Sequence, residues 1–172
     1  MKWRKQPLLL LLTLLLAGCQ GLPEPREMGD MALLRTMGVD RGTDGPALTV
    51  STGPRAKGLE GERQSALLLS AQAPTLSEGA LAIQGQSDSF VFFGYVDQLL
   101  LGQALAGEDV LPVLDWFARD IELSLNAQLW LIRDATARTA VESGGEQGVE
   151  DRLATLRTDG RLGVGGIPRT AG

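Results

Sequence analysis

The sequence offers few side chains suited to covalent or metal chemistry. Among its 172 residues there is no histidine and a single cysteine, Cys19. Catalysis by Ser-His-Asp or Cys-His arrangements is excluded, and so is any metal site with histidine ligands. One cysteine also cannot form a disulfide or a cysteine-based metal site within one chain. We therefore expect a protein that is not an enzyme and holds no metal.

A group of carboxylates is the remaining candidate for acid–base catalysis or Ca²⁺ binding. Asp115 and Asp120 flank Trp116-Phe117 in a predicted helix, and Glu122 follows them. Their spacing matches no calcium loop. We interpret these carboxylates as part of a solvated helix face.

The aromatic residues line a pocket or, as is more common, belong to the core. In the predicted strand 123–133 the apolar residues alternate at odd numbers from 123 to 131, whereas Trp130 falls among the polar, even-numbered ones. We therefore expect Trp130 to be exposed, and we regard Trp130 and Tyr95 as candidate contacts for a partner. The aromatic residues considered are Phe92, Phe93, Tyr95, Trp116 and Trp130.

The first residues have the composition of a bacterial export signal. Lys2, Arg4 and Lys5 form a positive region, and residues 8–16 are leucine apart from Thr13. This apolar run is about half the roughly 20 residues that a membrane-spanning helix needs.

The residues after the leucine run predict a covalent modification. Leu16, Ala17, Gly18 and Cys19 resemble the bacterial lipobox, in which the cysteine thiol receives a diacylglyceryl group and cleavage leaves that cysteine first. We expect 1–18 to be a signal peptide, and a diacyl anchor on Cys19 to hold the protein on the extracytoplasmic face of the membrane. The alternatives are an ordinary signal peptide with an incidental cysteine and a retained membrane anchor.

The charge balance limits the partners. The chain has 21 acidic and 16 basic residues, a formal charge of −5. This excess argues against binding to nucleic acid. An acidic surface also gains nothing from an anionic bilayer, so the lipid anchor would supply the membrane affinity. The 44% of apolar residues is an ordinary value for a globular domain.

A β-hairpin is predicted at the start of the domain. Residues 19–30 read as a tether, and the mostly apolar 31–39 could be a strand or a short helix followed by a strand. Glycine, aspartate and proline at 40–46 indicate a turn, and 47–52 alternate between apolar and polar residues. Residues 53–62 are polar and glycine-rich, which predicts a loop.

Further elements alternate between strand and helix. Thr75 and Glu78 have the spacing of a capping box, which predicts a helix to about Gln84. We therefore predict one α+β domain over 31–142, with a mixed β-sheet and flanking helices. The other predicted elements are a strand at 65–73, where alanine and leucine also suit a helix, strands at 95–101 and 123–133, and helices at 103–106, 110–119 and 135–142, the last capped by Asp134.

Residues 143–172 are rich in glycine and predict a partly disordered, flexible tail. One charged segment within it, 149–157, could form a weak amphipathic helix. No cofactor is expected, apart from the covalent diacylglycerol on Cys19.

Several segments, in this order and spacing, match the pattern of one known family. They follow the lipobox and are Arg26–Leu33 (REMGDMAL), Met37–Asp40 (MGVD), Thr75–Leu81, Phe92–Tyr95 (FFGY), Leu101–Ala106, Val113–Asp120 (VLDWFARD) and Ile121–Leu131. Together they resemble the Ger(x)C family, the lipoprotein C subunits of the nutrient germinant receptors of bacterial spores. In Tyr95 the chain departs from the histidine typical of that family.

The resemblance implies a non-enzymatic, lipid-anchored subunit at the inner membrane of the spore. There it would act as a scaffold or transmit a signal beside the integral membrane A and B subunits of the receptor. Family members carry further domains, so 143–172 could also be the truncated start of the next one. An independent solute-binding envelope lipoprotein and a non-functional truncated remnant are the alternatives.

Overall fold

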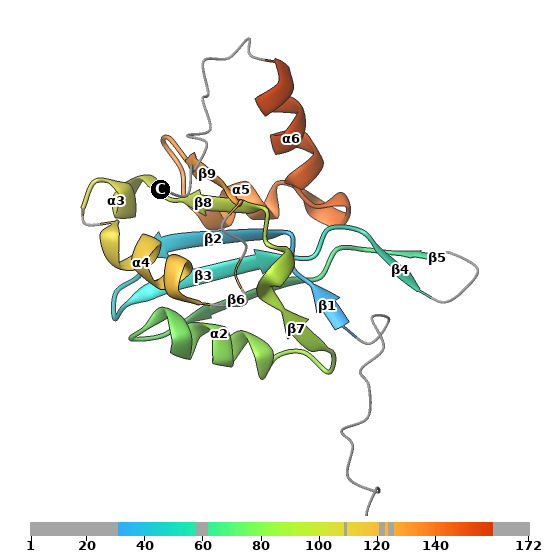
Figure 1. Cartoon of the computed structure of the whole chain (residues 1–172), viewed down its shortest axis with the longest axis horizontal. Helices are drawn as coiled ribbons and strands as arrows, with labels where there is room; N and C mark the ends of the chain where they lie inside the picture. Colours follow the sequence, from blue (N-terminus) through green and yellow to red (C-terminus); the bar gives the residue numbers. More distant parts are fainter. Residues whose placement is uncertain (1–30, 58–61, 109, 121–122, 124–125, 160–172) are drawn as a thin grey trace, which may run out of the picture.

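A five-stranded mixed sheet forms the centre of the computed structural model, which describes residues 31–57, 62–108, 110–120, 123 and 126–159 (Figure 1). The elements are β1 (Met31–Leu33), β2 (Thr36–Arg41), β3 (Pro46–Ser51), β4 (Arg55–Lys57), β5 (Glu62–Gln64), β6 (Leu68–Gln72), α2 (Leu76–Gln84), β7 (Phe90–Phe92), η2 (Phe93–Tyr95), β8 (Gln98–Leu101), α3 (Gln103–Ala106), α4 (Leu111–Arg119), β9 (Gln128–Leu131), α5 (Ala137–Glu142), η3 (Gly145–Gln147) and α6 (Glu150–Asp159).

The strand order of the sheet is β6-β3-β2-β8-β9. Strands β6, β3 and β2 are antiparallel neighbours, whereas β2, β8 and β9 run parallel. Met37 of β2 pairs with Val50 on one side and with Leu99 on the other. The predicted α+β class and its mixed sheet with flanking helices are therefore confirmed.

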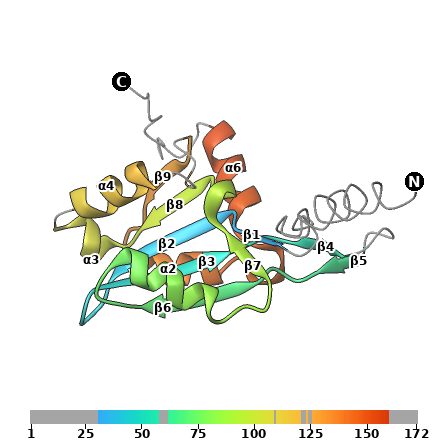
Figure 2. The same ribbon diagram turned by 60° about the horizontal axis from the view of Figure 1, so that its bottom comes forward.

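Two short two-stranded sheets lie at one end of the main sheet. Strands β1 and β7 pair in parallel, and β4 and β5 form an antiparallel ribbon that projects from the body, while α3 lies at the opposite end (Figures 1 and 2). The ribbon corrects the prediction of a loop at 53–62. Its residues lack an apolar period, so the local pattern contained no strand signal.

Helices cover both faces of the main sheet (Figure 2). Alternate residues of β2 point to opposite faces. Met37 and Val39 join the larger core cluster, to which α2, α4, β1 and β7 contribute. Gly38 lies against Ala137 and Val141 of α5 on the other face. The smaller cluster on that face consists of Leu100, Trp130, Ala137, Val141, Val149 and Leu153.

Local signals in the sequence located the hairpin and the start of α2. The β2–β3 hairpin is as predicted. Thr75 caps α2 by accepting a hydrogen bond from the Glu78 N–H at 3.2 Å, and its hydroxyl donates to Glu78 Oε2 at 3.1 Å. The Glu78 carboxylate therefore accepts from the Thr75 hydroxyl, whereas a capping box predicts that it accepts from the Thr75 backbone N–H.

Three predicted elements have different bounds in the structure. The strand expected at 95–101 begins at Gln98, because η2 occupies 93–95. Within the described part of 123–133, only Gln128–Leu131 is a strand. Thr136, not Asp134, caps α5, and Asp134 has a positive φ of 58°.

Residues that follow the expected boundary at 142 pack on the sheet. Val149 and Leu153 are buried against the sheet, so the start of α6 belongs to the same folded body. Within the predicted tail the structure has η3 and α6, and α6 lies where the charged segment 149–157 predicted a helix; residues 160–172 lie outside the described part of the chain.

Candidate functional site

The lipidation site predicted at the N-terminus lies outside the described residues. Leu16, Ala17, Gly18 and Cys19 all precede Met31, the first residue that the structure describes. The diacylglyceryl modification of Cys19 therefore stays a prediction.

Tyr95, the first predicted partner contact, is half exposed, at 50%. Its ring packs edge-on against Phe92, with 5.8 Å between the ring centroids. The pairing of Met31 with Phe90 brings the entry of the chain into the domain close to this residue. The structure thus supports Tyr95 as an accessible side chain at the end of the domain where the chain enters.

Trp130, the second predicted partner contact, is buried, with 4% of its surface exposed. The expectation of an exposed tryptophan is wrong. The alternation in β9 is real, since Leu129 packs on the larger core and Trp130 points to the other face. That other face is covered by α5 and the start of α6, which a strand pattern cannot reveal.

The predicted carboxylate group behaves as a helix surface. Asp115 forms an ion pair with Arg119, one helical turn away, at 2.9 Å. Glu122 lies outside the described residues, and Asp120 ends α4. Among the described residues, no cluster of three or more acidic, histidine or cysteine side chains could hold a metal ion.

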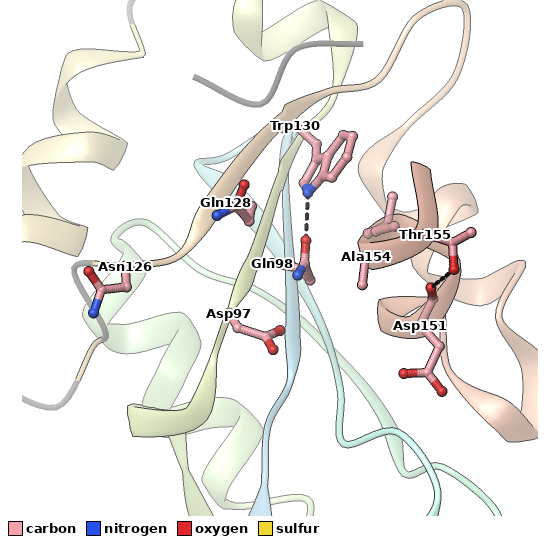
Figure 3. A pocket seen from close by; sticks show the side chains of 9 residues that line it. Asp97, Gln98, Asn126, Gln128, Trp130, Asp151, Ala154 and Thr155 are labelled. Atoms are coloured by element: carbon pink, nitrogen blue, oxygen red, sulfur yellow. Dashed lines mark hydrogen bonds between the residues drawn. The ribbon is translucent and has the colours of Figure 1, made fainter. Parts of the chain in front are cut away.

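A polar pocket of about 570 Å³ opens between the starts of β8 and β9 and helix α6 (Figure 3). Gln98 and Trp130 come from the strands, and their side chains are hydrogen-bonded from Trp130 Nε1 to Gln98 Oε1 at 2.6 Å. The lining of the pocket also includes Asp97, Asn126, Gln128 and Asp151.

An ion pair lies next to this pocket. Arg35 donates to Asp97 Oδ2 at 2.8 Å. Burial works to lower the pKa of the Arg35 guanidinium, but the hydrogen bond and the negative charge of Asp97 outweigh it and raise that pKa. Asp97 Oδ1 is buried and finds no hydrogen-bond partner within the described part of the chain.

Glu150, at the start of α6, is the most deeply buried acidic side chain described, with 3% of its surface exposed. Burial is the main effect and raises the pKa of its carboxyl. The negative charges of Asp151 and Asp97 raise this pKa further. A hydrogen bond from its own backbone N–H and the positive charge of Arg35 partly oppose the rise. Its Oε2 has no hydrogen-bond partner among the described residues.

A second cavity, of about 500 Å³, lies at the opposite end of the sheet. It is lined mainly by apolar side chains from the β2–β3 turn, the start of α2, and α3 and α4. Trp116 closes one side by donating to Ser77 Oγ at 2.9 Å. The two cavities therefore differ in chemistry, since the one beside α6 is polar and this one is apolar.

Sequence reasoning missed most residues of the polar pocket. Asp97 and Gln98 are polar residues that directly precede an apolar run, and this was the one local signal available. Arg35 and Glu150 gave no signal, because their neighbours in space are distant in the sequence.

Fold and site together define an α+β domain with a two-sided mixed sheet and a polar pocket at one end. Comparison with known families then assigns it. The family model described as the spore germination protein N-terminal domain matches residues 24–149. The chain belongs to this family, which confirms the resemblance seen in the sequence and connects the protein to spore germination. No curated protein and no solved structure matches the chain.

In the stretches that the structure describes, no helix has the length and apolar character needed to cross a bilayer.

Proposed function

We propose that this protein is a non-enzymatic, lipid-anchored subunit of a spore germinant receptor. It stands on the outer face of the spore's inner membrane and acts as a scaffold beside the integral membrane A and B subunits. The observation that carries the proposal is the family match over 24–149, preceded by the lipobox-like Leu16–Cys19.

The anchor would concentrate the domain near its partners. Two acyl chains hold a protein on a membrane far more firmly than one. Confinement to the membrane raises the effective concentration of the domain around other membrane proteins, so weak contacts suffice for assembly.

The tether limits how far the first strand of the domain can lie from the membrane. Residues 20–30 separate Cys19 from β1, and a fully extended chain of this length spans about 40 Å at most. Because β1 pairs with β7, the end that carries Tyr95 lies within this reach of the lipid, and we propose that it faces the membrane. Tyr95 is therefore the side chain that we propose for contact with the integral subunits.

Affinity purification from spore membranes tests the anchor. We compare the wild-type chain with Cys19→Ala, and with Gln20→Ala as a matched control next to the lipobox. We expect wild type and Gln20→Ala in the membrane fraction, with multi-spanning proteins identified by mass spectrometry. Cys19→Ala should be lost from that fraction. A membrane-bound wild type without such partners would refute the receptor role but not the anchor.

The same purification tests the contact at Tyr95. We expect Tyr95→Ser to stay on the membrane but to lose most of the co-purified subunits. Leu81→Ser is the control, because Leu81 is also exposed but lies on α2. Equal recovery of partners with the two variants would refute the proposed orientation and leave the anchor unaffected.

A further inference from the structure

A row of polar side chains crosses the face of the main sheet that α5 and α6 cover. Four neighbouring strands contribute one residue each, and the strand register places these residues side by side in the order Ser51, Thr36, Gln98 and Gln128. They share the face of Leu100 and Trp130, because side chains two positions apart on a strand point the same way. The first three are at most 5% exposed. Buried polar groups are normally hydrogen-bonded, so any group of this row that lacks a partner calls for an explanation.

Gln98 holds a donor of this kind in a fixed orientation. Its Oε1 accepts from the Trp130 indole at 2.6 Å, and an indole N–H can only donate, so this bond fixes which end of the amide is the oxygen. The other end, Nε2, has no hydrogen-bond partner in the described part of the chain. Unlike Thr36 Oγ1, which is also unpaired among the described residues, Nε2 is not sealed from solvent, and Gln98 lines the pocket beside α6. The row therefore offers this pocket an oriented donor that a ligand can reach.

The pocket has the size of a small-molecule site. Its volume of about 570 Å³ falls within the roughly 300–1,000 Å³ of typical ligand pockets. Strands β8 and β9 supply one wall and α6 the other (Figure 3). Typical pockets are mainly apolar, whereas uncharged polar side chains from both walls line this one. These side chains are Gln98, Asn126, Gln128 and Thr155.

The charged residues beside the pocket favour neither a cation nor an anion. The ion pair with Arg35 at 2.8 Å balances the charge of Asp97, whose other oxygen is sealed from solvent. Asp151 is exposed, and its carboxylate points away from Gln98 (Figure 3). Neither lysine nor arginine is among the described residues that line the pocket, so an anion has no partner there. A charged ligand would lose its hydration without gaining an opposite charge, whereas an uncharged one would not.

We propose that this pocket binds an uncharged polyol of the size of a monosaccharide. One hydroxyl oxygen of the ligand accepts from Gln98 Nε2. A hydroxyl both donates and accepts, as a side-chain amide does, so a second hydroxyl pairs with Gln128 in the neighbouring strand. Binding of this kind goes beyond the role of a receptor scaffold and does not depend on the lipid anchor or on the A and B subunits.

Three molecules with a six-membered ring test the proposal, namely glucose, cyclohexanol and glucosamine. Cyclohexanol keeps a single hydroxyl, and glucosamine carries an ammonium group in place of one hydroxyl at mildly acidic pH. The full-length chain is labelled with ¹⁵N, and the Trp130 indole signal and the Gln98 side-chain NH₂ signals are followed during each titration. Substitution of Trp3 and Trp116 by phenylalanine identifies the Trp130 signal. A nuclear Overhauser effect from this indole identifies the NH₂ group of Gln98, to which it is hydrogen-bonded.

We expect glucose to shift both signals in a saturable way, with an affinity at least about tenfold above those of cyclohexanol and glucosamine. Gln98→Glu should weaken glucose binding by about tenfold, because it keeps an acceptor for Trp130 but replaces the Nε2 donor by an oxygen. Gln147→Glu is the matched control, because Gln147 is exposed in η3 and is not among the residues that line the pocket. Its affinity for glucose should equal that of wild type.

The absence of a saturable shift at Trp130 with glucose would overturn the proposal. Equally tight binding of glucosamine would show that the ligand need not be uncharged, and equally tight binding of cyclohexanol that it need not be a polyol; either result would also overturn it. Unchanged glucose binding by Gln98→Glu would overturn the role of Nε2. If this variant fails to fold, the wild-type NH₂ signals of Gln98 decide, because signals that stay in place while Trp130 shifts would exclude the contact.

Discussion

Helices α5 and α6 pack on the same face of the sheet, and a buried carboxylate lies at the start of each. At α5 the carboxylate is Asp40 of β2, 8% exposed; at α6 it is the helix's own Glu150, 3% exposed. The two carboxylates are nearly equally buried but differ in their hydrogen bonds. This difference indicates how firmly each helix is held.

Asp40 fixes α5 through both of its oxygens. Oδ1 accepts from the Ala137 N–H at 2.7 Å and Oδ2 from the Arg138 N–H at 2.8 Å. These N–H groups have no partner within the helix, because they belong to its first turn. Thr136 satisfies a third N–H, that of Thr139, at 3.0 Å. The N-terminus of α5 is therefore tied to the sheet by charged, well-aligned hydrogen bonds.

Glu150 lacks comparable partners. Its Oε2 is unpaired among the described residues, and burial raises the pKa of the carboxyl. Space for the carboxylate exists because Gly53 and Gly148, both with positive φ, have no Cβ where it lies. Leu153 of α6 and Val149, directly before the helix, are the buried apolar side chains of this segment, and the polar pocket lies between part of α6 and β9.

The family match covers one of the two helices. It includes α5 and ends at residue 149, directly before α6. We infer that the docking of α5 is integral to the domain, whereas α6 is a less firmly held addition. Substitutions at the two helices can test this difference, beginning with the one that should have the largest effect.

Gly38→Val should dislodge α5 and lower the free energy of unfolding by about 3 kcal/mol. A Cβ at Gly38 would already lie 3.1 Å from Ala137 Cβ and 3.3 Å from the Ala137 backbone, and valine adds two methyl groups. Urea unfolding followed by circular dichroism measures the change.

Gly107→Val is the matched control, because the nearest atom to a Cβ there is the Gln103 oxygen at 3.6 Å. This variant should lose less than about 1 kcal/mol. A Gly38→Val protein as stable as the control would show that α5 can move away from the sheet at little cost, which would contradict the comparison.

Asp40→Ala should lower the free energy of unfolding by about 2 kcal/mol, because it leaves two N–H groups of α5 without their charged acceptor. Asp44→Ala, in the exposed β2–β3 turn, should change it by less than about 0.5 kcal/mol. Amide hydrogen exchange of Ala137 and Arg138 reports the effect locally. Unchanged exchange at these amides would show that water replaces Asp40 without loss.

The residues that hold α5 were visible in the sequence, but their role was not. Met37–Asp40 stood out as part of the family pattern, and the hairpin that contains it was predicted from turn residues and alternation. The contact from Asp40 to Ala137 joins residues 97 positions apart, so no local pattern could reveal it. The sequence predicted Asp134 as the cap of α5, which is wrong, because the contact of Asp40 with the start of this helix leaves no local signal.

The polar pocket was beyond sequence reasoning for a related cause. Its walls come from residues near 97, 126–130 and 151–155, and they meet only in the folded chain. The Trp130 prediction failed because period-two alternation identifies the two faces of a strand but does not show that helices cover both. By contrast Thr75 was located correctly, since a capping box acts within four residues.

Glu150→Gln should have the smallest effect and should stabilise the protein at neutral pH. The pKa of Glu150 is higher in the folded protein than in the unfolded chain, so the folded protein binds this proton more tightly and protonation favours folding. The contribution of this carboxyl to stability is therefore complete below its ordinary pKa of 4.5 and is lost as the pH rises through the folded-state value. Glutamine mimics the protonated form at every pH.

The free energies of unfolding of wild type and Glu150→Gln should thus coincide in acid and diverge towards neutral pH, with the variant the more stable. Arg35, Asp97 and Asp151 all act on Glu150, so only the difference between the two proteins isolates its titration. Glu146→Gln, exposed in η3, should show no such divergence. A wild type that is the more stable at neutral pH would mean that the attraction of Arg35 exceeds the effect of burial. Glu150 would then hold α6 as Asp40 holds α5, and the distinction between the two helices would fail.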